Sequence, residues 1–99
     1  MKRVLILLIL LNCNFMFSQK TFIPDDAFEQ ALINFGYDDV FDDSVTTSSI
    51  DTILTLYINN MGISDLSGIE DFSSLSELFC YDNQIEHLNL SNNYNLLLA

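Results

Sequence analysis

Residues 75–88 read LSELFCYDNQIEHL, and their spacing of apolar residues also occurs 22 positions earlier in the chain. Both stretches place an aliphatic residue or a cysteine at the same five positions. These are Ile53, Leu56, Ile58, Ile63 and Leu66 in the first stretch, and Leu75, Leu78, Cys80, Ile85 and Leu88 in the second. A third copy opens at Leu96, 21 positions after Leu75. The second half of the chain is therefore expected to consist of repeated structural units.

This repeat has the length and the pattern of a leucine-rich repeat. Repeats of about 20 to 29 residues with the pattern L-x-x-L-x-L/C-x-x-N-x-L/I-x-x-L are typical of that class. The second copy matches at every consensus position and has Asn83 at the asparagine position. The first copy departs there, because Met61, followed by Gly62, takes the place of the asparagine.

The alternating apolar residues of each copy predict a short strand whose inward side chains enter a narrow core. Such a strand cannot bury its apolar side alone, so successive copies must stack and pair edge to edge. We expect an α/β leucine-rich repeat solenoid, with short parallel strands, one per repeat, and an N-terminal α-helical cap. The repeats are assigned to residues 53–74 and 75–95, with the start of a third at 96–99. Asn83 and Asn93 are expected to turn the chain, and the Asn83 amide to bond unpaired backbone groups.

Residues 20–52 are assigned to the N-terminal cap, with a helix over residues 24–35. The sequence IPDD before it suits a helix start, because proline fits the first turn and aspartate side chains satisfy free N–H groups. Asp26 and Glu29 have the spacing of a capping box, and Gly36 supplies the stop. One apolar stripe of the helix is formed by Phe28, Ala31, Leu32 and Phe35.

The segment after this helix, residues 37–43, is strongly acidic. It reads YDDVFDD, with four aspartates around Val40 and Phe41. Clustered carboxylates are suitable Ca²⁺ ligands, so a calcium site is one interpretation, although the spacing of an EF-hand loop is absent. The favoured interpretation is a solvated turn with Val40 and Phe41 packed inward.

Residues 1–19 have the pattern of a secretory signal peptide, with a basic start at Lys2 and Arg3, a short apolar run and a small residue near the end. Even residues 4–17, taken as one helix, measure roughly 21 Å, against roughly 30 Å of bilayer hydrocarbon. A lipoprotein modified on Cys13 is an alternative, but asparagine rather than a small residue precedes that cysteine. We expect the protein to be secreted or at the cell surface.

The charge of the mature chain excludes some partners. Removal of Lys2 and Arg3 changes the formal net charge from −11 to −13, and leaves Lys20 as the single cation against fourteen acidic residues. A field of this sign repels nucleic acid and anionic membrane surfaces. We therefore expect no nucleic-acid partner, and the short apolar run of the leader adds the expectation of no membrane span in the mature chain.

The sequence offers little for catalysis or metal binding. Cys80 is the one thiol left after the leader, so it has no partner for an internal disulfide and is expected to be a small buried apolar residue. His87 is the one imidazole and lies in a variable slot that usually faces outward. A hydrolytic nucleophile needs a base beside it. We expect no enzymatic activity, no cofactor and no metal.

Several motifs are shared with a known family. They are IPDDxFEQAL at residues 23–32, GYDD at 36–39, GISDLSGI at 62–69 and LxLSNN at 88–93. In these stretches the chain resembles secreted bacterial leucine-rich repeat proteins, including internalin-like ones, over residues 21–99. The resemblance implies a curved solenoid that presents its concave inner sheet to a protein or glycan partner, without catalysis.

The outward positions of the repeat strands are the candidates for partner binding. They are Thr55, Tyr57, Asn59, Glu77, Phe79 and Tyr81. Tyr57 and Phe79 occupy the same slot in adjacent strands, and exposed aromatic side chains on a concave sheet are typical recognition anchors. The alternative interpretation is that Phe79 simply covers Tyr57 in a cross-strand pair.

The last residues of the chain suggest a second interpretation. Residues 95–99, NLLLA, open a third coil and predict an apolar, unpaired strand edge. Repeat stacks generally need about three units and terminal caps to be stable. The alternative to a recognition module is therefore a truncated fragment of a longer secreted leucine-rich repeat protein with no independent function. We expect weak stability, or self-association through the exposed C-terminal repeat edge.

Overall fold

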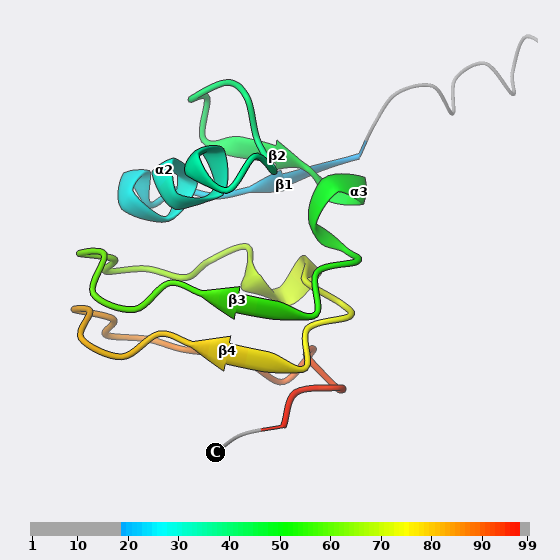
Figure 1. Cartoon of the computed structure of the whole chain (residues 1–99), viewed down its shortest axis with the longest axis vertical. Helices are drawn as coiled ribbons and strands as arrows, with labels where there is room; N and C mark the ends of the chain where they lie inside the picture. Colours follow the sequence, from blue (N-terminus) through cyan, green and yellow to red (C-terminus); the bar gives the residue numbers. More distant parts are fainter. Residues whose placement is uncertain (1–18, 98–99) are drawn as a thin grey trace, which may run out of the picture.

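The structure, a computed structural model, describes residues 19–97 (Figure 1). The expected signal peptide therefore lies outside the described residues, apart from Gln19. The elements in chain order are β1 (Lys20–Phe22), α2 (Asp26–Asn34), β2 (Ser44–Thr46), α3 (Thr47–Ile50), β3 (Thr55–Tyr57), the 3-10 helix η2 (Ile69–Asp71) and β4 (Glu77–Phe79). Within the described range, no helix combines the length and the apolar character that a membrane crossing requires.

The N-terminal part joins α2 to a two-stranded sheet. β1 and β2 pair antiparallel, and Val45 of β2 shares one apolar core with α2. The helix begins at Asp26 because the Oδ1 atom of Asp25 accepts a hydrogen bond from Phe28 N at 3.0 Å. The expected helix over residues 24–35 is present but shorter at both ends. The capping role expected of Asp26 and Glu29 is wrong, because Asp25 is the cap.

The apolar stripe of α2 is buried except at its last member. The first three residues of the stripe are at most 4% exposed, whereas Phe35 is 42% exposed. The helix ends at Asn34, and Gly36 follows with a left-handed φ of +88°, as expected for a stop. Phe35 is the C-cap residue, whose N–H still donates to Ala31 O at 3.0 Å, and its ring lies edge-on to Tyr37 with centroids 6.3 Å apart.

Residues 53–74 and 75–95, here the first and second coils, lie one beneath the other in Figure 1. Their strands β3 and β4 are parallel, and Leu56 is opposite Leu78. The register is therefore an offset of 22 residues, as the repeat predicts. The parallel pairing of the two strands is confirmed.

Backbone hydrogen bonds continue the pairing beyond the strands. Ile58 N donates to Phe79 O at 2.8 Å, and Asn60 N donates to Tyr81 O at 2.9 Å. These donors lie past the end of β3 and would otherwise need water or side-chain partners. The second coil therefore satisfies the backbone of the first where its strand gives way to the turn.

The inward side chains of the two coils differ in burial. All five inward positions of the first coil are at most 6% exposed. In the second coil Leu75 is buried, Leu78 and Cys80 are half-buried against the same core, and Leu88 is 45% exposed. Cys80 thus packs on the core as expected, but less completely than a buried apolar residue.

Asn83 fastens the turn of the first coil to the second. Its Oδ1 atom accepts hydrogen bonds from Met61 N at 2.9 Å and Ile63 N at 3.0 Å. Its Nδ2 atom donates to Ile58 O at 2.7 Å and Cys80 O at 3.0 Å. The expected bonding of the Asn83 amide to unpaired backbone groups is confirmed.

Asn93 plays a similar part on the return side of the second coil. It is 4% exposed, and its Nδ2 atom donates to Ile69 O at 2.9 Å and Phe72 O at 3.1 Å. Its backbone N donates to Leu90 O, three residues earlier, which closes a turn. A buried amide with two backbone acceptors fixes the return side of one coil on the next.

Asp25 joins the N-terminal cap to the first coil. While its Oδ1 atom caps α2, its Oδ2 atom accepts hydrogen bonds from Ser64 N at 2.9 Å and Asp65 N at 3.0 Å. Beside this contact the rings of Phe28 and Phe72 stack with centroids 5.9 Å apart. The cap and the first coil therefore share a core and a charge-assisted hydrogen-bond network.

Gly68 permits the close approach of the cap. A Cβ atom at this position would clash with Ile23 Cδ1 and lie 2.7 Å from Phe22 O, and φ is +105°. A side chain is excluded both by the contact with β1 and by the left-handed backbone. The glycine of the SGI sequence in the first coil is therefore needed for the cap to pack against it.

Candidate functional site

The six outward residues proposed for binding lie on and beside the paired strands. Tyr57 and Tyr81 are 59% and 61% exposed, Glu77 is exposed, and the other three are half-buried. The strand register places Thr55 opposite Glu77 and Tyr57 opposite Phe79. Asn59 and Tyr81 follow the two strands, in the stretch where backbone pairing continues. The structure therefore brings the six residues together as two adjacent rows, here called the outward face.

An aromatic stack is the main feature of the outward face. The rings of Tyr57 and Phe79 lie 4.8 Å apart between centroids, with an interplanar angle of 5°. Next to it, Thr55 Oγ1 donates to Glu77 Oε1 at 3.1 Å. Phe79 does cover Tyr57 across the strands, as one of the two interpretations predicts. More than half of the Tyr57 surface nevertheless stays exposed, and its role as an anchor stays a prediction.

A hollow of about 180 Å³ adjoins this stack at the joint between cap and first coil. Its lining residues are Phe35, Tyr37, Thr55, Leu56 and Tyr57. We call it the aromatic slot. The sequence interpretation missed the contribution of Phe35 and Tyr37, because it placed Phe35 in the buried stripe. The signal was the FGY sequence at the helix stop, since a left-handed glycine turns the chain between the two aromatic residues.

A second, polar hollow of about 240 Å³ shares Tyr37 with the aromatic slot. It is lined by Gly36, Tyr37, Asp38, Asp39, Thr46 and Ser49. At its rim, Lys20 Nζ donates to Thr46 Oγ1 at 3.3 Å. Tyr37 therefore lines both an aromatic hollow and an acidic one.

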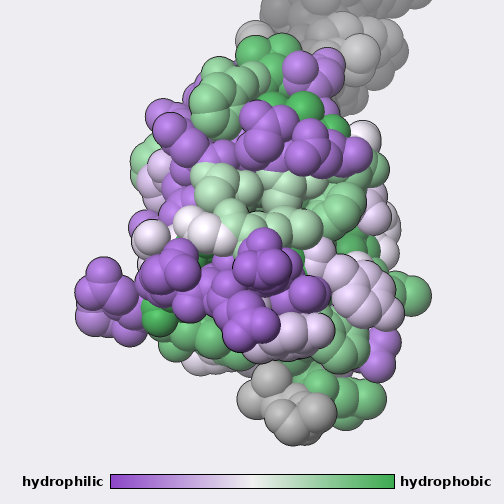
Figure 2. All heavy atoms as spheres, turned by 60° about the vertical axis from the view of Figure 1, so that its left-hand side comes forward, coloured by the Kyte–Doolittle hydropathy of each residue, from purple (hydrophilic) through white to green (hydrophobic). Residues whose placement is uncertain are grey.

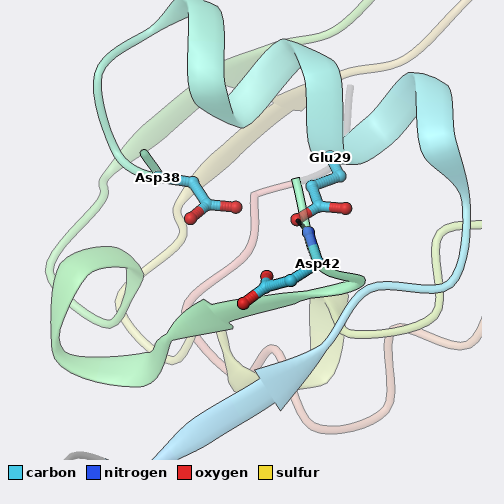
Figure 3. Close-up of side chains that lie close together, drawn as sticks. All are labelled: Glu29, Asp38 and Asp42. Atoms are coloured by element: carbon cyan, nitrogen blue, oxygen red, sulfur yellow. Dashed lines mark hydrogen bonds between the residues drawn. The ribbon is translucent and has the colours of Figure 1, made fainter. Parts of the chain in front are cut away.

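Glu29, Asp38 and Asp42 form an acidic cluster in the cap (Figure 3). Each offers one carboxylate oxygen, and these three atoms lie within 4.8 Å of one another. Both oxygens of Glu29 already accept hydrogen bonds, from Asp42 N and Asp43 N at 2.9 Å each. The cluster contains the kind of oxygen that suits Ca²⁺, but its geometry is explained by Glu29 holding the backbone of the acidic loop.

The anchoring of this loop corrects one expectation. Val40 and Phe41 are 55% and 54% exposed, so the prediction that they pack inward is wrong. The loop turns its backbone toward α2, where buried Glu29 accepts two N–H groups. Asp38 Oδ1 meanwhile accepts from Asp39 N at 2.8 Å and from Val40 N at 3.4 Å. With the backbone bonded on the inside, the two apolar side chains point outward.

The electrostatics of the cluster follow from burial. Burial raises the pKa of the Glu29 carboxyl above its ordinary value, two backbone hydrogen bonds oppose the shift, and neighbouring Asp38 adds to it. Asp38 Oδ2 is itself buried and has no hydrogen-bond partner among the described residues. Because Glu29 is 0% exposed, it ionises less readily than an exposed glutamate, even though both of its oxygens accept hydrogen bonds.

Cys80 and His87, the two side chains considered for catalysis, lie on the strand side and the return side of the second coil. Burial raises the pKa of the half-buried Cys80 thiol, which lowers its thiolate fraction at neutral pH. His87 is exposed, as expected, and forms a parallel backbone bridge with Asp65 on the return side.

A hollow of about 370 Å³ on the return side is lined by acidic residues and His87, among them Asp65, Glu70 and Glu86. Hydrogen bonds from Ser67 lower the pKa of Asp65, with a smaller effect of His87.

Comparison with known proteins places the fold. No protein-family model matches the chain, and no curated protein matches it. Among solved structures, an internalin (InlF) from Listeria monocytogenes is similar, with a TM-score of 0.67 and 25% identity over 76% of this chain and 22% of that one. The functional domain of InlJ from Listeria monocytogenes has a TM-score of 0.65 and 30% identity over 80% of this chain and 18% of that one.

A third similar structure holds the CBM51-2 and INT domains of ZmpB from Clostridium perfringens. Its TM-score is 0.68 at 24% identity, over 80% of this chain and 16% of that one, so it supports the fold alone. The chain spans about a fifth of the length of each of these structures. Taken with the 22-residue offset between β3 and β4, these likenesses show that the chain has a leucine-rich-repeat-type fold similar to that of bacterial internalins.

Proposed function

We propose that the protein is an exported, non-catalytic recognition or adhesion module that binds a protein or glycan partner through its outward face. In this proposal the two coils are consecutive turns of a solenoid, sealed at the front by the helical cap, and the outward face belongs to its concave sheet. The likeness to internalins supports a role at the bacterial surface. The amino-terminal pattern supports export.

The observation that carries the proposal is the exposed aromatic stack. Tyr57 keeps 59% of its surface exposed although it belongs to the paired strand β3, and Tyr81 keeps 61%. Aromatic side chains bury a large area while few rotatable bonds are fixed, so they are enriched among binding hot spots. Polar Asn59 and charged Glu77 beside them offer hydrogen-bonding groups. This combination of aromatic anchors and polar neighbours is typical of a recognition surface.

A selection experiment tests the proposal. The protein is screened against a glycan panel and a peptide-display library, and the ligand with the highest affinity is measured against two variants. Tyr57→Ala should weaken its binding about thirtyfold, the effect of a typical hot spot. Leu54→Ala is the matched control, because Leu54 is 62% exposed but is not one of the six outward residues. It should bind within about twofold of the unmodified protein.

The readout includes folding as well as affinity. Circular dichroism should show the same spectrum for all three proteins, since the Tyr57 substitution removes a ring that is 59% exposed and leaves the backbone unchanged. Equal affinity of the Tyr57 and Leu54 variants for the selected ligand would contradict the proposal.

A further inference from the structure

The aromatic slot has the size of a single side chain. Its volume of about 180 Å³ is below the range of roughly 300 to 1,000 Å³ that is usual for small-molecule pockets. Three of its five lining residues are aromatic, and Leu56 forms a buried part of its wall. Phe35 and Tyr57 are 42% and 59% exposed, so both rings remain accessible to a ligand.

Carboxylates lie close to the slot on β4 and on the cap. Thr55 lines the slot, and its Oγ1 atom donates a hydrogen bond to Glu77 Oε1 at 3.1 Å. Tyr37, which also lines it, is followed by Asp38 and Asp39 in the neighbouring polar hollow. The potential at the slot is therefore expected to be negative, which attracts a cation before it makes contact.

The charge of the rest of the molecule has the same sign. The described residues contain all fourteen acidic side chains and one cation, Lys20. Lys20 Nζ is bonded to Thr46 at the rim of the polar hollow, and neither residue lines the slot. Figure 2, viewed from the side of the turns that follow β3 and β4, shows hydrophilic side chains in bands on either side of an apolar stretch.

We infer that the aromatic slot receives an arginine side chain from a basic segment of a protein partner. The inference rests on the proposed function, since the slot shares Thr55 and Tyr57 with the outward face. A guanidinium group is planar and weakly hydrated, so it stacks on aromatic rings and can donate to carboxylates at the same time. The slot offers both: rings from Phe35, Tyr37 and Tyr57, and the Glu77 carboxylate at its edge.

A neutral sugar could also stack on aromatic rings, but it would not use the charge. An aromatic wall alone does not distinguish a sugar from a cation. The fourteen carboxylates favour the cation, because they lower its free energy at the slot and leave that of a neutral ligand unchanged. A neutral glycan is therefore a competing outcome of the test.

The test uses two short peptides that differ in one charge. The peptide Ac-Gly-Arg-Gly-NH₂ is titrated into the isotopically labelled protein, and amide and side-chain resonances are followed by NMR. Ac-Gly-Cit-Gly-NH₂, in which citrulline replaces arginine, has nearly the same shape and no charge. We expect the arginine peptide to shift the resonances of Tyr37, Thr55 and Tyr57 and to bind about tenfold more tightly than the citrulline peptide. Added salt should weaken the binding of the arginine peptide more than that of the citrulline peptide.

Two variants locate the effect. Tyr57→Leu keeps an apolar wall but removes the aromatic ring, and should weaken the binding of the arginine peptide at least threefold. Tyr94→Leu is the matched control, because Tyr94 is 85% exposed and belongs neither to the outward face nor to the slot. It should leave the affinity for the arginine peptide unchanged.

The outcomes separate this inference from the proposed function. Equal binding of the two peptides, shifts spread over the acidic surface instead of the slot, or tighter binding of a neutral N-acetylglucosamine oligomer would each overturn it. If a ligand selected on the outward face depends on Tyr57 while the arginine peptide does not bind, the proposed function stands and the arginine site fails. If the peptide binds at the slot while no selected ligand depends on Tyr57, the proposed function fails instead.

Discussion

The first and second coils have the same apolar spacing but differ in how their side chains are covered. Leu66 of the first coil is 2% exposed, whereas Leu88, 22 positions later, is 45% exposed. The first coil lies between the cap on one side and the second coil on the other. Beyond the second coil, the described chain contributes short contacts such as Leu97 N to Ser76 O at 2.8 Å. A repeat consensus thus tells which side chains point inward, while the neighbouring coils decide how deeply they are buried.

The same comparison explains the one departure from the consensus. Asn83 of the second coil bonds the turn of the coil before it, through Met61 N and Ile63 N. The first coil is preceded by the cap, which is tied by Asp25 to Ser64 N and Asp65 N instead. Met61 can therefore replace the asparagine, because no earlier turn needs its amide.

The largest expected effect is at the contact between cap and first coil. Gly68→Ala places a Cβ atom against Ile23 and the backbone oxygen of Phe22, in a left-handed conformation. Overpacking and backbone strain together should lower the free energy of unfolding by about 4 kcal/mol. The measurement is urea unfolding followed by circular dichroism.

Gly62→Ala separates the two causes. Gly62 also has a left-handed φ, +70°, but a Cβ atom there meets nothing within 4 Å. Its substitution should cost about 1 kcal/mol, the backbone term alone. Equal losses for the two glycines would show that the cap does not press on the first coil.

The next effect compares one residue type in the two coils. Leu66→Ala removes a buried side chain and should cost about 3 kcal/mol, the typical result for a buried leucine. Leu88→Ala removes a side chain that is 45% exposed and should cost less than about 1 kcal/mol. Thermal unfolding of the two variants measures the difference. Similar losses would mean that both coils are covered equally in solution, for example by self-association of the second coil's edge.

The asparagine that links the coils comes next. Asn83→Ala removes the partners of Met61 N, Ile63 N and Ile58 O. Because water reaches part of this turn, we expect a loss of about 2 kcal/mol in unfolding free energy. Asn92→Ala is the control, since Asn92 is exposed in the next turn, and its loss should stay within about 0.5 kcal/mol. An Asn83→Ala variant with an unchanged free energy of unfolding would show that this asparagine does not stabilise the contact between the coils.

The smallest effect concerns pH and the cap. Because the pKa of Glu29 is raised in the folded protein, folding takes up protons at pH values between the ordinary pKa of glutamate and the folded pKa. The contribution of Glu29 to stability is therefore full below the ordinary value and is lost as pH rises through the folded pKa. Glu29→Gln should flatten the increase in stability seen on lowering the pH from about 7 to about 4. Asp26→Asn, which removes an exposed carboxylate from the same helix, should change this slope less.

Much of the fold was accessible from the sequence, because periodic patterns report local geometry. The 22-residue offset predicted which strand residues face each other, and Leu56 and Leu78 do. Gly36 and the Phe28 stripe predicted a helix and its end to within two residues. The bonding of the Asn83 amide was also predicted correctly, since a polar amide at a strand end has few other partners.

Features that depend on contacts between distant residues could not be predicted. Glu29 has the spacing of a capping residue, but its carboxylate is used by a loop 13 and 14 positions later. The same loop geometry turned Val40 and Phe41 outward. The aromatic slot arises where Phe35 and Tyr37 of the cap meet Tyr57 of the first coil, and no local pattern joins those positions. The positions and the register of the outward residues could be predicted from the sequence, but the hollow beside them could not.

Amide hydrogen exchange tests most directly whether the two coils are stacked in register. The amides of Ile58 and Asn60 lie beyond β3 and donate to Phe79 O and Tyr81 O of the second coil. We expect both to exchange at least about a hundredfold more slowly than the exposed amide of Asn92, because the coils must separate before these N–H groups meet solvent. Exchange of Ile58 and Asn60 as fast as that of Asn92 would show that the coils are not paired, and would contradict the account.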